Sequence, residues 1–136
     1  MSITIPLLHI VEDNELDRMV FRKQMLAAAT VEAVQEHEEG EAAKAFLHSR
    51  LQSVESLPQL ILIDVHLPGT CDGWELLAWI RQQEALAHTK VVMFTSSPQL
   101  QTRPHEFVAD PDATIHAKPL TQDMANSIAT WFQAQR

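Results

Sequence analysis

The chain has 136 residues, 46% of them hydrophobic and 21% charged, which is typical of one folded domain and unlike a disordered or membrane-spanning chain. Its formal charge of −8 argues against nonspecific binding to nucleic acid or to an anionic membrane surface. The N-terminus lacks the features of a signal peptide, and the lone cysteine, Cys71, cannot form an internal disulfide, so we expect a cytoplasmic protein.

Short apolar runs alternate with amphipathic stretches along the whole chain, with no internal repeat and no linker to a second domain. We therefore expect one domain over residues 1–136. Prolines in the segment 98–112 leave room there only for a short or distorted helix. In chain order, strands are expected at 7–11, 31–37, 60–65, 90–94 and 113–117, and helices at 15–29, 41–51, 74–84 and after Thr121.

The first and last of these helices carry clear start signals. Asp13 or Asn14 can cap the first helix, and Thr121 can cap the last one. The apolar residues of the first helix recur at helical spacing, which predicts an amphipathic helix packed on a sheet. They are Leu16, Met19, Val20, Phe21, Met25 and Leu26.

The alternation of strand and helix predicts an α/β fold with a parallel sheet, helices on both of its faces and right-handed crossovers. A chain of this length suits an open five-stranded sheet better than a barrel. We expect a flavodoxin-like (βα)5 three-layer sandwich with the strand order 2-1-3-4-5. Ligands of such sheets bind beyond the carboxyl ends of the strands.

Asp64 ends the most apolar strand, where a carboxylate is costly unless a cation or hydrogen-bond donors meet it. In the predicted strand order, Glu12 and Asp13 at the end of the first strand lie beside it. Three carboxylates this close repel one another unless a divalent cation lies among them, and Mg2+ suits such oxygen ligands. Thr95 and Lys118 end the fourth and fifth strands and could bind two oxygens of a phosphoryl group carried by Asp64.

The histidines are numerous but scattered along the chain. They form neither HxxxH nor HExxH pairs, and no cysteine pair accompanies them. This spacing predicts histidines at the surface rather than a structural zinc site.

The chain resembles, in the order and spacing of its motifs, the response-regulator receiver domain of two-component signalling. The resemblance covers essentially the whole chain and is closest to stand-alone receivers of the chemotaxis-regulator kind. Each motif alone is weak, but their combination at successive strand ends is specific. The matching segments are LHIVEDNELDR, LILIDVHLPGTCDGWELL, VVMFTSS and HAKPL.

The resemblance implies a role for each residue at the strand ends. Asp64 resembles the phospho-accepting aspartate and Thr95 the switch hydroxyl. Lys118 resembles the lysine that contacts the phosphoryl group, and its bond to Pro119 is commonly cis in that family. The implied Mg2+ ligands are the side chains of Glu12, Asp13 and Asp64 and the backbone carbonyl of His66.

The implied function is that of a stand-alone response regulator receiver with no output domain. A histidine kinase or phosphotransfer histidine would donate the phosphoryl group, and hydrolysis would follow. Such a protein catalyses its own phosphorylation and dephosphorylation and is not otherwise an enzyme. Its signal would leave through a partner protein, through phosphorelay, or through a homodimer formed by the last two helices and the last strand, with no role for nucleic acid or membrane.

The chain departs from the family pattern near its last strand. The position three residues before Lys118 usually holds Tyr or Phe but here holds Ile115, so an aromatic flip cannot carry the signal. Neighbouring His116 is a possible substitute, although the alternation of a strand aims it to the opposite face. The proline-containing segment 98–112 also departs from the regular helix expected at the usual output face.

Three alternatives remain beside the receiver interpretation. A pseudo-receiver that only binds other proteins would be expected to lack some acidic or lysine positions, and none is missing. A haloacid-dehalogenase-like aspartyl phosphatase would normally carry a second Asp two residues after Asp64, where this chain has His66. A flavodoxin-like electron carrier needs a phosphate-binding loop after the first strand, where the acidic EDNELD would repel phosphate.

Overall fold

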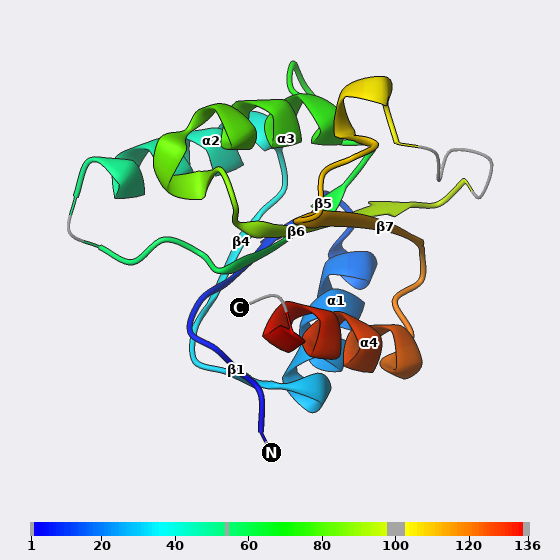
Figure 1. Ribbon diagram of the computed structural model, residues 1–136. Coiled ribbons are helices and arrows are strands. Elements are labelled where there is room, and N and C mark those ends of the chain that lie inside the picture. The colour runs from blue at the N-terminus through cyan, green and yellow to red at the C-terminus, as the bar shows by residue number, and fades with distance from the viewer. Residues whose placement is uncertain (1, 54, 98–102, 135–136) are drawn as a thin grey trace.

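The computed structural model describes residues 2–53, 55–97 and 103–134 and forms three layers (Figure 1). The strands are β1 (Thr4–Ile5), β2 (Leu8–Val11), β3 (Thr30–Val31), β4 (Val34–His37), β5 (Leu60–Asp64), β6 (Lys90–Thr95) and β7 (Ala113–Ala117). The α-helices are α1 (Glu15–Ala28), α2 (Gly40–Leu51), α3 (Gly73–Gln82) and α4 (Gln122–Ala134), and the 3₁₀ helices are η1 (Glu84–Leu86) and η3 (His105–Phe107). None of the helices in this described part has the length and apolar character needed to span a membrane.

The main sheet confirms the predicted topology. Its five parallel strands lie in the order β4-β2-β5-β6-β7, which is 2-1-3-4-5 when the five strands are counted along the chain. The flavodoxin-like α/β fold is therefore established. All five carboxyl ends point toward the same edge because every pairing is parallel.

Two hydrophobic cores cover the two faces of this sheet. Helices α2 and α3 pack on one face, and α1 and α4 pack on the other (Figure 1). Alternate residues of β5 divide between the cores: Ile61 and Ile63 face α2 and α3, whereas Leu60 and Leu62 face α1 and α4. Burial on both faces explains why this strand is a continuous apolar run rather than an alternating one.

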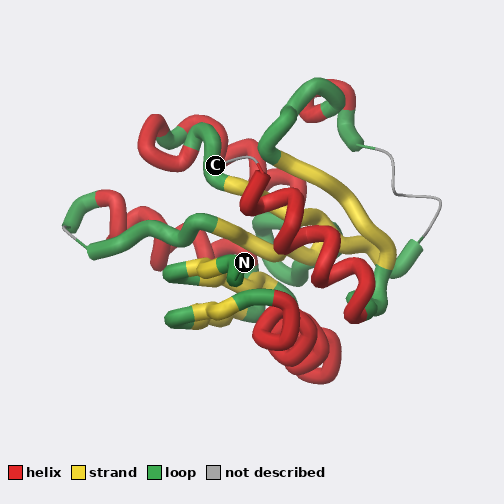
Figure 2. Tube along the Cα trace, turned by 60° about the horizontal axis from the view of Figure 1, so that its bottom comes forward, coloured by secondary structure: helices red, strands yellow, loops and turns green. Residues whose placement is uncertain are grey.

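The second predicted strand is interrupted in the structure, and the first is preceded by a short strand that was not predicted. Pro6 has no backbone N–H and separates β1 from β2. The segment that pairs with them breaks at the same level into β3 and β4, so that β1 and β3 form a small parallel sheet beside the N-terminus (Figure 2). The prediction of one strand over 31–37 was therefore too simple.

Helix α1 buries only part of its apolar residues. Phe21 and Met25 are fully buried, and the Phe21 ring lies 4.5 Å from that of Phe94 on β6. Leu16, Met19 and Leu26, by contrast, are 68%, 48% and 47% exposed. The helix was predicted correctly, but its six apolar residues spread over more of the helix surface than one sheet face can cover.

His9 contradicts the prediction that the histidines lie at the surface. It is fully buried in β2, and its Nε2 lies 2.9 Å from Nδ1 of His37 on β4. The Phe46 ring packs against both imidazoles. Burial and the neighbouring His37 lower the pKa of His9 to about 3, so this imidazole is neutral in the folded protein.

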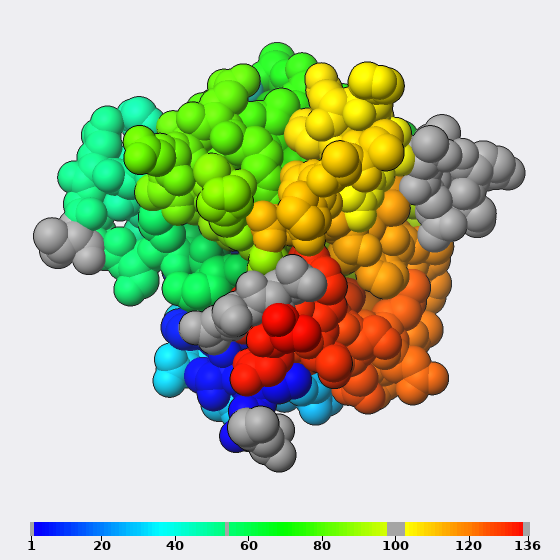
Figure 3. All heavy atoms as spheres, in the orientation of Figure 1, coloured from blue at the N-terminus to red at the C-terminus, as the bar shows by residue number. Residues whose placement is uncertain are grey.

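The connection from β6 to β7 carries only the 3₁₀ helix η3 in its described part, so a short helix was a correct prediction there. Residues 98–102 of this connection lie outside the described residues. The segment 103–112 packs beside α3 on the surface (yellow in Figure 3). The Phe107 ring stacks on Trp74 of α3 with their centroids 5.7 Å apart.

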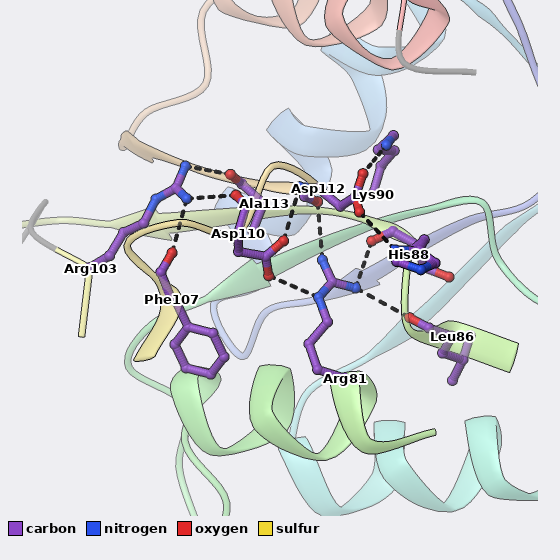
Figure 4. A network of polar contacts seen from close by, with 10 residues as sticks. Arg81, Leu86, His88, Lys90, Arg103, Phe107, Asp110, Asp112 and Ala113 are labelled. Atoms are coloured by element: carbon purple, nitrogen blue, oxygen red, sulfur yellow. Dashed lines mark hydrogen bonds and ion pairs between the residues drawn. The ribbon is translucent and has the colours of Figure 1, made fainter. Parts of the chain in front are cut away.

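Two arginines fasten this segment to the rest of the domain (Figure 4). Arg81 of α3 forms an ion pair with Asp110 at 2.9 Å and donates to the carbonyl oxygens of Leu86, Thr89 and Asp112. Arg103 donates to the carbonyls of Phe107, Asp110 and Ala113, and Lys90 pairs with Asp112. These side-chain contacts, rather than the hydrogen bonds of a regular helix, hold the described part of this connection against the domain.

Candidate functional site

The carboxyl edge of the sheet brings the predicted site residues together. Strand pairing places Val11 beside Ile63, and Thr95 beside Ala117, so the residues that follow β2, β5, β6 and β7 meet at one edge. Glu12, Asp64 and Thr95 are buried there. The site is therefore built from segments far apart in the sequence but adjacent at the strand ends.

Three carboxylates form one cluster at this edge. Oxygen atoms of Glu12, Asp13 and Asp64 all lie within 4.8 Å of one another, with Glu12 and Asp64 buried and Asp13 exposed. Within residues 2–53, 55–97 and 103–134, no other group of three His, Cys, Asp or Glu side chains is arranged to hold a metal ion. The donor set is all oxygen and strongly negative, which fits a hard divalent cation such as Mg2+.

Backbone hydrogen bonds hold Glu12 in place. Its N–H donates to the carbonyl of His37 at 3.0 Å, and its Oε2 accepts from the N–H of Asn14 at 3.1 Å. Asn14 is the N-cap of α1 and accepts from the N–H of Asp17, so the strand end and the helix start form one rigid turn. The cap that the sequence predicted at Asp13 or Asn14 is Asn14.

Lys118 reaches into the carboxylate cluster from the end of β7. Its Nζ donates to Glu12 at 2.8 Å, to Asp17 at 3.0 Å and to Asp64 at 3.2 Å. Its backbone N–H donates to the carbonyl of Thr95 at 2.8 Å, and its peptide bond to Pro119 is cis, as the resemblance implied. The contact with Asp17 was not predicted, because an acid in the first turn of a helix has an ordinary role there.

The pKa values of two of these groups are raised, for different reasons. Burial raises the pKa of Glu12 to about 7, although hydrogen bonds from Lys118 and Asn14 oppose the shift. Burial disfavours the ammonium form of Lys118, but the surrounding carboxylates outweigh burial and raise its pKa well above the usual range. Lys118 is therefore a fixed positive charge, whereas a cation that binds Glu12 would have to displace a proton whenever this carboxyl group is protonated.

The backbone around Asp64 is tightly constrained. Its Oδ1 accepts from the N–H of His66 at 3.0 Å, and the N–H of Val65 donates to Phe94 at 2.8 Å. Gly73, the first residue of α3, lies so close that a Cβ there would be 2.3 Å from the carbonyl oxygen of Asp64. Only glycine permits this approach, which brings the start of α3 against the end of β5.

Thr95 lies at the predicted strand end, but its hydroxyl is occupied. The Oγ1 accepts from the N–H of Ser97 at 3.1 Å and lies 3.3 Å from the Ser97 carbonyl, to which it donates. To donate to a group on Asp64, the hydroxyl would have to give up its hydrogen bond to the Ser97 carbonyl.

Ile115 and His116 face opposite sides of the sheet, as strand alternation predicted. Ile115 packs against the core beneath α2 and α3, whereas the His116 ring lies 6.1 Å from that of Phe94 in the other core. Burial lowers the pKa of His116. His116 therefore does not occupy the place of the aromatic residue that Ile115 replaces.

Comparison with known proteins points to one family. The family model described as "Response regulator receiver domain" matches residues 8–128. The polar-differentiation response regulator DivK of Brucella ovis is 33% identical over 87 residues, which cover 64% of this chain and 63% of DivK. A probable methanogenesis regulatory protein, FilR2 of Methanothrix harundinacea, is 31% identical over 88 residues, which cover 65% of this chain and 56% of FilR2. The match thus spans less than two thirds of either relative.

Solved structures of response regulators share the fold. A putative response regulator from Chloroflexus aurantiacus superposes with a TM-score of 0.74 at 22% identity, over 98% of this chain and 99% of that one. The Mn(2+)-bound form of response regulator Rcp1 has a TM-score of 0.67 at 26% identity, over 92% of this chain and 90% of its own.

Proposed function

Because the chain belongs to the response regulator receiver family, we propose that it accepts a phosphoryl group on Asp64 and signals through the resulting change in partner binding. One observation carries the proposal. Asp64 belongs to a carboxylate cluster fit for a cation, and its Oδ2 lies 3.2 Å from the ammonium group of Lys118. A transferred phosphoryl group would meet positive charge on both sides.

In the proposed reaction, a carboxylate oxygen of Asp64 attacks the phosphorus of a phosphohistidine on a kinase or phosphotransfer protein. A P–O bond to Asp64 forms as the P–N bond breaks, and the histidine keeps the electron pair. Lys118 binds one phosphoryl oxygen, and the Thr95 hydroxyl binds another after leaving Ser97. Hydrolysis by water later returns Asp64 to the carboxylate and releases phosphate.

A divalent cation fits the proposed reaction. Mg2+ would be held by Glu12, Asp13, Asp64 and the backbone carbonyl of His66, and when bound it would neutralise charge on the transferred phosphoryl group. The Mn(2+)-bound form of Rcp1, 26% identical, supports a cation in this chain too. The residues of the chain itself would position Asp64 and Lys118 for this reaction.

Output in this proposal runs through other protein molecules. The phosphorylated chain would bind a partner, pass its phosphoryl group to a phosphotransfer protein, or dimerise through the face formed by the segment 103–112, β7 and α4. Phosphorylation would reach that face as Thr95 leaves Ser97 and Ile115 repacks. The protein would act on its own Asp64 and would not be an enzyme for other substrates.

Intact-mass spectrometry tests the proposal directly. Phosphoramidate or acetyl phosphate with Mg2+ should add one phosphoryl group to the wild-type chain and to Asp123→Asn, in which an exposed aspartate at the start of α4 is changed. Asp64→Asn should gain none. Equal labelling of Asp64→Asn and the wild type would refute Asp64 as the acceptor.

A further inference from the structure

Lys118 contacts two carboxylates of the cation cluster, Glu12 and Asp64, and a third carboxylate, Asp17, that lies outside it. An ammonium group has three N–H donors, and all three of its contacts here are carboxylates: Glu12, Asp17 and Asp64. Lys118 and Asp17 are 101 positions apart in the sequence, and their contact joins α1 to the end of β7. For Lys118 to bind a phosphoryl oxygen, one of these three acceptors must give way.

The three acceptors differ in how easily they can do so. The side chains of Glu12 and Asp64 are 0% and 5% exposed, and both belong to the cluster that fits a cation. The side chain of Asp17 is 31% exposed and lies outside that cluster. Water can solvate a carboxylate that is already partly exposed, so release of Asp17 costs less free energy than release of Glu12.

Local structure keeps Asp17 aimed at the lysine. Its backbone N–H donates to the Asn14 side chain at 2.9 Å, which fixes it in the first turn of α1. Neighbouring Glu15, in the same turn, is exposed, and its side chain forms no hydrogen bond or ion pair described in the structure. The contact with Lys118 is therefore specific to Asp17 and not a general effect of the acidic helix start.

We propose that Asp17 is a positioning residue that holds Lys118 while Asp64 is unmodified and competes with the phosphoryl group for it. The inference rests on the proposed phosphorylation of Asp64 and adds regulation of that site. Asp17 lowers the affinity of Lys118 for a phosphoryl group. Removal of the Asp17 carboxylate therefore favours the state in which Lys118 binds the phosphoryl group.

Beryllofluoride, a phosphoryl mimic that binds a carboxylate noncovalently, allows an equilibrium test on the full chain with Mg2+. In a titration followed by 19F NMR, Asp17→Asn should bind beryllofluoride roughly twofold to fivefold more tightly than the wild type, as expected for one partly exposed ion pair. Asp17→Ala should move the affinity in the same direction. Glu15→Gln removes the same charge from the same turn and should bind like the wild type.

The Lys118 side chain gives a second readout that needs no anion. In Asp17→Asn, the side-chain 15N signal of Lys118 should shift from its wild-type position, whereas Glu15→Gln should leave it in place. Equal or weaker beryllofluoride binding by both Asp17 variants would overturn the competition. If neither the wild type nor Glu15→Gln binds beryllofluoride, the proposed phosphorylation fails instead, and the 15N signal still decides whether Asp17 holds Lys118.

Discussion

The Nζ of Lys118 lies 3.2 Å from Oδ2 of Asp64, although the two residues are 54 positions apart and their strands do not pair. Strand β6 lies between β5 and β7 in the sheet, so the lysine side chain crosses the end of β6 to reach the aspartate. The hydrogen bond from the Lys118 backbone to Thr95 anchors it at that crossing. The positions of Asp64, Thr95 and Lys118 relative to one another are thus set by the order of the strands in the sheet.

Lys118→Met should make the protein more dependent on a cation. The change leaves the buried carboxylates without their ammonium partner, so we expect a lower melting temperature without Mg2+. Loss of the positive charge also removes repulsion of Mg2+, so the stabilisation by Mg2+ should exceed that of the wild type. Thermal unfolding with and without Mg2+ measures both effects. Lys23→Met, at an exposed position on α1, should behave like the wild type, and an unchanged Mg2+ effect in Lys118→Met would contradict the assignment.

Mg2+ affinity should increase as the pH is raised from about 6 to 8, because a cation must displace the proton of Glu12, whose pKa is about 7. Since this pKa is raised in the folded state, the same group lowers the free energy of unfolding as the pH rises from 4.5 through 7 without a cation. Calorimetric titration with Mg2+ at several pH values measures the affinity. Glu12→Gln should bind more weakly and lose most of the pH dependence, whereas Glu15→Gln should keep it.

His9 should make the fold sensitive to acid. Its pKa of about 3 in the folded protein lies below the ordinary value of 6.5, so the unfolded chain takes up the proton first. The resulting stability is complete above pH 6.5 and is lost as the pH falls toward 3, by at most about 1.4 kcal/mol per pH unit. Urea unfolding of His9→Phe should show a shallower loss over this range. A wild-type slope in His9→Phe, or an altered one in the exposed control His105→Gln, would contradict this account.

Arg81→Lys should destabilise the protein by about 3 kcal/mol, because one ammonium group cannot reach Asp110 and the three carbonyls that the guanidinium contacts. Chemical denaturation measures the change. The segment 103–112 should also become more susceptible to protease. Arg22→Lys, which alters a more exposed ion pair with Glu36, should cost about 0.5 kcal/mol or less. Equal effects of the two changes would show that the Arg81 network does not hold this segment.

The sequence predicted best where one physical constraint dominated. Parallel β-strands buried on both faces make Leu60–Asp64 continuous and apolar, so the lone carboxylate at its end was recognisable, and the strand order followed from alternation. Asp17 was missed because its partner comes from the other end of the chain, and acids are common in a first helical turn. The burial of His9 was missed because the spacing of histidines in the sequence tests only for metal sites. It gives no information on contacts such as the one between His9 and the ring of Phe46. Leu16 and Met19 are exposed, which shows that helical periodicity alone does not identify the apolar residues that the sheet covers.

The ion pairs of Lys118 with Glu12 and Asp17 join residues that are 106 and 101 positions apart in the sequence. Glu12 follows the first strand of the main sheet, and Lys118 follows its last strand. No contiguous fragment shorter than residues 12–118 contains both Glu12 and Lys118, so the site forms only when the last strand has joined the sheet. A cation or phosphoryl group bound there would therefore stabilise the whole domain against unfolding and not one loop. Binding at this site is therefore coupled to folding of the whole sheet, and a change in the free energy of unfolding would report how fully the site is occupied.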